Sequence, residues 1–128
     1  MRDRAELVRR LYSALNAGDV EALSLLLDAD ACWHTPGRSP IAGDYVGRDA
    51  VLGHFAGYRS FQAEAPSVVA ADGRVVAIQA GCCTVFEIRD GRIVDGREHF
   101  FDLHAWDALW SEGAVPDRPY TSRRGRDC

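Results

Sequence analysis

Two Asp-Gly dipeptides, at residues 72–73 and 90–91, restrict the second half of this chain to a narrow set of folds. Asp-Gly between two alternating segments is a strong sequence signal for a tight β-hairpin, because both turn residues tolerate positive φ. The segments that flank the two dipeptides are 67–71, 74–79, 83–89 and 92–101. We therefore predict two antiparallel hairpins in this half of the chain.

The first third of the chain has the periodicity of helices. Apolar residues recur at helical spacing between residues 7 and 15, behind an Asp3/Glu6 capping-box pattern. Gly18 is a typical helix stop, and Asp19 is a typical N-cap for a second helix. The pattern predicts helices over residues 4–17 and 20–27.

The middle of the chain predicts a short strand over residues 31–35, followed by a loop from Gly37 to Gly47. Asp49 is the expected cap of a third helix. Residues 103–110 predict a short closing helix. Helices followed by antiparallel hairpins are typical of an α+β domain with helices packed on one face of a sheet.

Length and charge restrict the domain count and the partners. A chain of 128 residues suits one domain, which we place at residues 1–110 with a flexible tail at 111–128. The net charge of −4 argues against nucleic acid as a partner. The sequence has no apolar run long enough to cross a membrane and no secretory signal, so we expect a cytoplasmic protein.

Four stretches carry a resemblance to a known family: residues 11–23, with the sequence LYSALNAGDVEAL, residues 33–37 (WHTPG) followed by residues 41–51, residues 85–94, with the sequence VFEIRDGRIV, and residues 100–102 (FFD). They resemble the SnoaL-like proteins of the nuclear-transport-factor-2-like superfamily. The resemblance implies N-terminal helices packed on a curved antiparallel sheet that forms a cone-shaped pocket. It also implies a homodimer, no cofactor, and a small apolar or aromatic ligand. Members include polyketide ring cyclases, epoxide hydrolases and steroid isomerases.

The chain departs from the family pattern at one place, because only five residues separate Ile78 from Thr84. Either the central hairpin is very short or the two strands merge into one. The epoxide hydrolases keep an Arg and an Asp in the longer stretch that this chain lacks, which weakens that activity as a prediction.

The last strand offers two alternative catalytic residues. Aligning the strand with that of the epoxide hydrolases places His99 at the catalytic Asp and Arg97 at the pocket Trp. The ring cyclases keep an acid/base Asp near the end of this strand, and Asp102 matches it better. Alternate residues of a strand face opposite sides, so only one of these two analogies can hold. A histidine has the advantage of an ordinary pKa near neutrality.

Other candidates surround the expected pocket. His34 is predicted either to donate a hydrogen bond to a substrate or to bond a backbone carbonyl in the core. The candidates for substrate binding, with Arg97, are the aromatic residues Trp33, Tyr45, Phe55 and Phe101. The spacing of cysteines and histidines demands no metal site. Two functions stay open: an enzyme that uses acid/base chemistry on a small apolar substrate, or a binding or assembly module without turnover.

Overall fold

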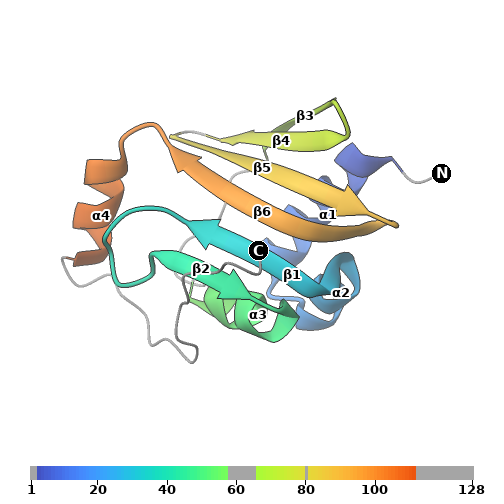
Figure 1. Cartoon of the computed structure of the whole chain (residues 1–128), viewed down its shortest axis with the longest axis horizontal. Helices are drawn as coiled ribbons and strands as arrows, with labels where there is room; N and C mark the ends of the chain where they lie inside the picture. The colour runs from blue at the N-terminus through green and yellow to red at the C-terminus, as the bar shows by residue number, and fades with distance from the viewer. Residues whose placement is uncertain (1–2, 58–65, 80, 112–128) are drawn as a thin grey trace.

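The computed structural model describes residues 3–57, 66–79 and 81–111, and in this part of the chain six strands form one curved sheet (Figure 1). The helices are α1 (Arg4–Ala17), α2 (Val20–Leu26), α3 (Arg48–Ala56) and α4 (Leu103–Ser111). The strands are β1 (Leu27–Thr35), β2 (Gly43–Val46), β3 (Ser67–Ala71), β4 (Arg74–Gln79), β5 (Cys82–Arg89) and β6 (Arg92–Phe100). The predicted α+β class is confirmed.

The strand order is β2-β1-β6-β5-β4-β3. Neighbouring strands are antiparallel, with the exception of β1 and β6, which run parallel. Helix α1 contacts β3 and β4, while α3 contacts β1 and β2, so the first three helices cover one face of the sheet (Figure 1). Because β1 and β6 are parallel, their carboxyl ends meet at the same edge of the sheet, beside α4.

The two N-terminal helices are confirmed to within a residue. The Asp3 carboxylate accepts a hydrogen bond from the Ala5 amide at 3.0 Å, which satisfies one of the unpaired donors at the start of α1. Gly18 ends α1 with φ +68°, a conformation that glycine adopts at low cost. Asp19 then caps α2 through a 3.1 Å bond from the Ala22 amide.

Both hairpins are confirmed. Asp72 and Asp90 have positive φ values of 52° and 53°, as the Asp-Gly turns require. The central connection is a very short hairpin, because Gln79 of β4 pairs directly with Cys82 of β5. The alternative of one merged strand is therefore wrong.

The structure corrects the prediction in three places. Strand β1 begins at Leu27 rather than residue 31, because fully buried Leu27 already pairs with Ile93. The predicted loop contains strand β2, which pairs with β1 and buries Tyr45 to 1% exposure. Helix α3 begins one residue before Asp49, with Gly47 as its N-cap and no side-chain cap.

The core lies between the helices and the covered face of the sheet. Leu7, Val8 and Leu11 of α1 pack there with Phe86 and Ile93 of the sheet, and all are buried. No helix in the described part of the chain is long and apolar enough to cross a bilayer. The predicted flexible tail lies, from residue 112 onward, outside the described residues.

Candidate functional site

Gly96 identifies the helix-covered face of β6. A Cβ atom at this position would collide with the indole ring of Trp33. The same ring packs against Phe55 of α3 at a centroid distance of 4.8 Å and against Phe86 at 5.6 Å. Strand residues alternate between faces, so Glu98 shares this covered face with Gly96. Arg97 and His99 lie on the opposite, outer face.

A chain of three hydrogen-bonded side chains lies on the covered face. The Thr35 hydroxyl donates to Glu98 Oε1 at 2.6 Å, and it also contacts His54 Nε2 at 2.9 Å. Because the hydroxyl proton is used toward Glu98, His54 must donate its Nε2 proton to Thr35 Oγ1. All three residues are at least nine-tenths buried, with Glu98 exposed by 9%. The arrangement fixes both the tautomer of His54 and the position of the Glu98 carboxylate.

Packing holds His54 in place. Its imidazole stacks on the Tyr45 ring at 4.0 Å, and the Tyr45 hydroxyl donates to the Ile41 carbonyl at 2.6 Å. A conjugated ring that is stacked on one side and hydrogen-bonded at its edge has little freedom to rotate. The Tyr45 hydroxyl is therefore already bonded inside the protein. The predicted role of Tyr45 in substrate binding stays a prediction.

Two neighbours of Glu98 keep their protons at neutral pH. Burial raises the pKa of the Tyr12 hydroxyl, and the Glu98 charge acts in the same direction. Burial, with the Glu98 charge as a second cause, raises the pKa of the Cys82 thiol to about 11. Cys82 therefore stays a neutral thiol and lacks the thiolate character of a nucleophile.

His34 lies on the outer face, between two carboxylates. Its Nδ1 is 2.7 Å from Asp44 Oδ1 on β2, and its Nε2 is 2.8 Å from Asp95 Oδ1 on β6. Only the imidazolium form can donate to both carboxylates at once. The pKa of His34 is raised above 6.5, chiefly by the hydrogen bond to Asp95, against the opposing effect of burial, and further by the bond to Asp44. The cation thus joins three adjacent strands.

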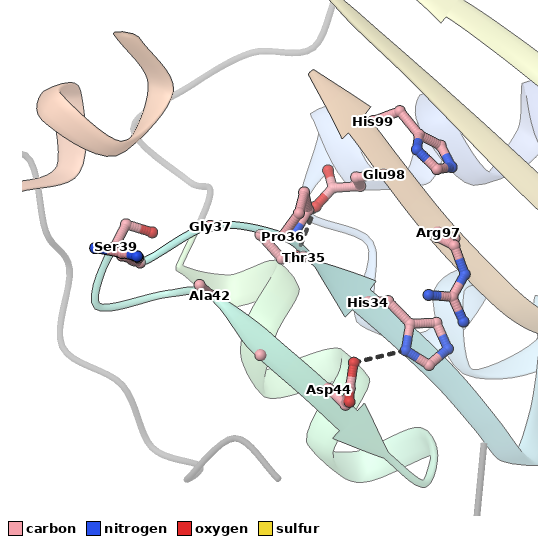
Figure 2. Close-up of a pocket in the computed structure, with 12 residues that line it drawn as sticks. His34, Thr35, Pro36, Gly37, Ser39, Ala42, Asp44, Arg97, Glu98 and His99 are labelled. Atoms are coloured by element: carbon pink, nitrogen blue, oxygen red, sulfur yellow. Dashed lines mark hydrogen bonds and ion pairs between the residues drawn. The ribbon is translucent and has the colours of Figure 1, made fainter. Parts of the chain in front are cut away.

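A pocket of about 390 Å³ opens where β1 and β6 end, and residues 34–39, 42–44 and 97–99 line it (Figure 2). Figure 2 shows His34, Arg97 and His99 together on one side, while Glu98 turns toward Thr35. The pocket thus receives side chains from both faces of the sheet. Its lining carries several charged groups, including Asp44, Arg97 and Glu98.

The loop that forms one wall of the pocket is tied to α4. The Asp107 carboxylate accepts hydrogen bonds from the backbone amides of Arg38 and Ser39, at 3.0 and 3.1 Å. A Cβ at Gly37, where φ is +105°, would collide with the same carboxylate. Helix α4 itself packs through Trp106, which stacks on Phe100 at 4.3 Å. These contacts fix the shape of the wall.

The structure brings three predicted site residues together and separates the others from them. His34, Arg97 and His99 line the pocket. Asp102 is exposed and caps α4 through a 3.0 Å bond from the Ala105 amide. The aromatic candidates lie elsewhere: Trp33, Tyr45 and Phe55 are buried in the core, and Phe101 is 70% exposed beyond the end of β6. The catalytic and binding roles of all these residues stay predictions.

Sequence reasoning missed the acidic and polar partners. Asp44 and Asp95 gave no signal, because neither belongs to a recognisable motif. Glu98 was visible as the neighbour of His99 on the other face, but the sequence did not show which face was covered. Gly96 was the available signal, since a glycine in a strand often marks a close approach of another group.

The arrangement suits proton transfer more than metal binding. No group of three histidine, cysteine, aspartate or glutamate side chains among the described residues could hold a metal ion. A nearly buried carboxylate beside a pocket, with its orientation fixed by hydrogen bonds, has the geometry of a general acid or base.

Comparison with known proteins shows the family to which the chain is similar. The SnoaL-like domain family matches residues 8–81. The structure of Bal32a, from a soil-derived mobile gene cassette, is 43% identical to this chain, covers 83% of it and 95% of its own chain, and superposes with a TM-score of 0.69. No curated protein matches the sequence.

Two more distant structures carry names that include an activity. A putative polyketide cyclase from Sinorhizobium meliloti is 20% identical, with 73% of this chain and 94% of that one covered and a TM-score of 0.60. An LEH-like epoxide hydrolase from M. tuberculosis is also 20% identical, with coverages of 84% and 91% and a TM-score of 0.60. At this identity the likeness shows a shared fold alone.

Proposed function

We propose that this chain, which belongs to the SnoaL-like family, is a small-molecule enzyme that works by acid/base chemistry without a cofactor. The observation that carries the proposal is Glu98, a carboxylate that is 9% exposed, hydrogen-bonded within the protein, and part of the pocket lining. The reaction class includes cyclisation and epoxide opening, in line with the names of two structures of the same fold, and it includes isomerisation as a third acid/base reaction.

Glu98 takes the catalytic role in this proposal, in preference to His99 or Asp102. The Thr35 hydroxyl stabilises the ionised carboxylate by donating to Oε1, and His54 holds that hydroxyl in place. A carboxylate held in one orientation accepts a proton from a substrate carbon or water without first reorganising. The same group then returns the proton to another atom of the substrate.

The experiment compares Glu98→Gln with the wild-type protein on two probe sets. Enolisable ketones in D₂O report deuterium exchange at the α-carbon by NMR, and small epoxides report ring opening. We expect Glu98→Gln to lower turnover by about 10²–10⁴-fold, the usual loss when acid/base catalysis is removed. Thr35→Val, which keeps the shape and removes the donor, is expected to reduce it by a smaller factor.

Glu87→Gln is the matched control, because Glu87 lies on the adjacent strand and outside the pocket, paired with Arg74 at 3.4 Å. Its turnover should stay within about threefold of wild type. If the wild-type protein binds the probes and turns over none of them, the proposal fails and the protein is a ligand-binding module.

We further propose that the protein is a homodimer that pairs through the outer face of β3–β5. Val69 and Ile78 on this face are 52% and 44% exposed, and Val76 and Val85 lie beside them in the strand register. A row of branched apolar side chains exposed on a sheet face is typical of an interaction surface.

A further inference from the structure

The acidic groups around the pocket are already engaged in hydrogen bonds inside the protein. Asp44 bonds His34, Glu98 accepts from Thr35, and Asp107 accepts from two backbone amides of the loop. Each carboxylate is thus compensated by donors of the protein itself. A cationic ligand would have to compete with these bonds.

The basic groups of the pocket are in the opposite situation. Neither the Arg97 guanidinium nor the His99 ring has a hydrogen bond or ion pair with another described side chain. The residues beside them on β5 are Val85 and Cys83, which offer no strong acceptor. Both basic groups are exposed at one end of the pocket, next to His34 (Figure 2).

Ser39 marks the other end of the pocket (Figure 2). Ser39 is 6% exposed, yet its hydroxyl oxygen has no hydrogen-bond partner within the described part of the chain. A buried hydroxyl without a partner is uncommon in proteins, because water has been removed and nothing replaces it. A polar atom of a bound molecule would supply the missing bond.

We propose that this pocket binds an elongated organic acid, with Arg97 as the anchor of its carboxylate and Ser39 as the partner of a hydroxyl or carbonyl at its far end. The planar guanidinium matches a carboxylate with two parallel hydrogen bonds, and His99 adds a third donor. The pocket volume of about 390 Å³ falls in the range of small-molecule sites. The inference deepens the proposed function and rests on it in one respect: Glu98 would act on the same molecule, between the two ends.

The test uses 3-(4-hydroxyphenyl)propanoate and its neutral amide as probes, with binding to the full chain measured by NMR titration at pH 7 and low salt. We expect the acid to bind at least tenfold more tightly than the amide. Arg97→Gln should remove this tenfold preference and leave the affinity for the amide unchanged. Arg92→Gln is the matched control, because Arg92 is an exposed arginine on the same strand and outside the pocket.

Ser39 is tested separately with a second probe pair. Ser39→Ala should weaken binding of the hydroxylated acid by about three- to tenfold and leave 3-phenylpropanoate unaffected, the loss expected for one neutral hydrogen bond. An effect of equal size on both acids would show a change in the loop and would overturn the role of Ser39.

Three results would overturn the anchor. The first is that the wild-type protein binds acid and amide equally, or binds neither. The second is that Arg97→Gln leaves the affinity for the acid intact. The third is that Arg97→Gln alters the oligomeric state without altering ligand binding. Loss of turnover in Glu98→Gln with intact preference for the acid supports both proposals. Preference for the acid without any turnover in wild type removes the enzyme proposal alone.

Discussion

Replacing Asp95 by asparagine should lower the stability of the protein at mildly acidic pH and leave it nearly unchanged at alkaline pH. Asparagine has the shape of aspartate and keeps an oxygen that can accept the His34 Nε2 proton at 2.8 Å. What the substitution removes is the negative charge that stabilises the imidazolium. The variant therefore isolates one charge effect while the surrounding packing is preserved.

The size of the effect follows from the kind of hydrogen bond that is lost. A bond between charged groups contributes about 1.5–3 kcal/mol to stability and a neutral one about 0.5–1.5 kcal/mol, so the variant should lose about 1–2 kcal/mol. The Asp95 side chain is 21% exposed, so solvent screens the charge only in part.

The sign of the pH dependence follows from the raised pKa of His34, whose ordinary value is 6.5. A group with a raised pKa in the folded protein stabilises the fold fully below its unfolded pKa, and this stabilisation disappears as pH rises through the folded pKa. Above that pKa the neutral ring has one proton for two carboxylates. The asparagine amide can donate to the unprotonated nitrogen, so the difference between variant and wild type should vanish or reverse.

Urea unfolding between pH 5.5 and 9 measures the free energies, and the NMR titration of the His34 ring protons measures its pKa. The chain has four histidines, so His34→Gln identifies the signal. Asp44→Asn is the companion variant. It should lower the pKa of His34 less than Asp95→Asn does, because the Asp95 bond is the largest cause of the shift. A His34 pKa at or below 6.5 in wild type, or equal losses at pH 6 and pH 9, would refute the reasoning.

Two further substitutions test the packing and the assembly. Gly96→Ala should destabilise the fold by about 1–3 kcal/mol, as overpacking does, because the added methyl meets the Trp33 ring. A loss under about 0.5 kcal/mol in urea unfolding would show that the ring moves aside. Ile78→Glu should convert the proposed dimer to a monomer in light scattering, whereas Leu25→Glu, on the exposed side of α2, should not; a wild-type monomer at micromolar concentration rules the dimer out.

Local chemistry explains why most of the fold could be predicted. Caps at Asp3 and Asp19, the stop at Gly18 and the two Asp-Gly turns each act over a few residues, so the sequence displays them directly. The elements that failed depend on distant partners. Strand β2 exists because β1 supplies its hydrogen bonds, and its four residues carry too little periodicity to distinguish them from a loop.

The same distinction separates the parts of the site that could be predicted from those that could not. Alternation along β6 places His99 and Glu98 on opposite faces, but it does not say which of the two faces the helices cover. The contact of Trp33 with Gly96, between two parallel strands far apart in sequence, breaks that symmetry. The missing side chain of a strand glycine leaves room on one face of the sheet. Where a neighbouring strand fills that room with a large aromatic ring, as Trp33 does at Gly96, that face is the covered one. Applied to β6, this reasoning turns attention from His99 to Glu98, and it makes the activity of Glu98→Gln the measurement that decides between the two faces.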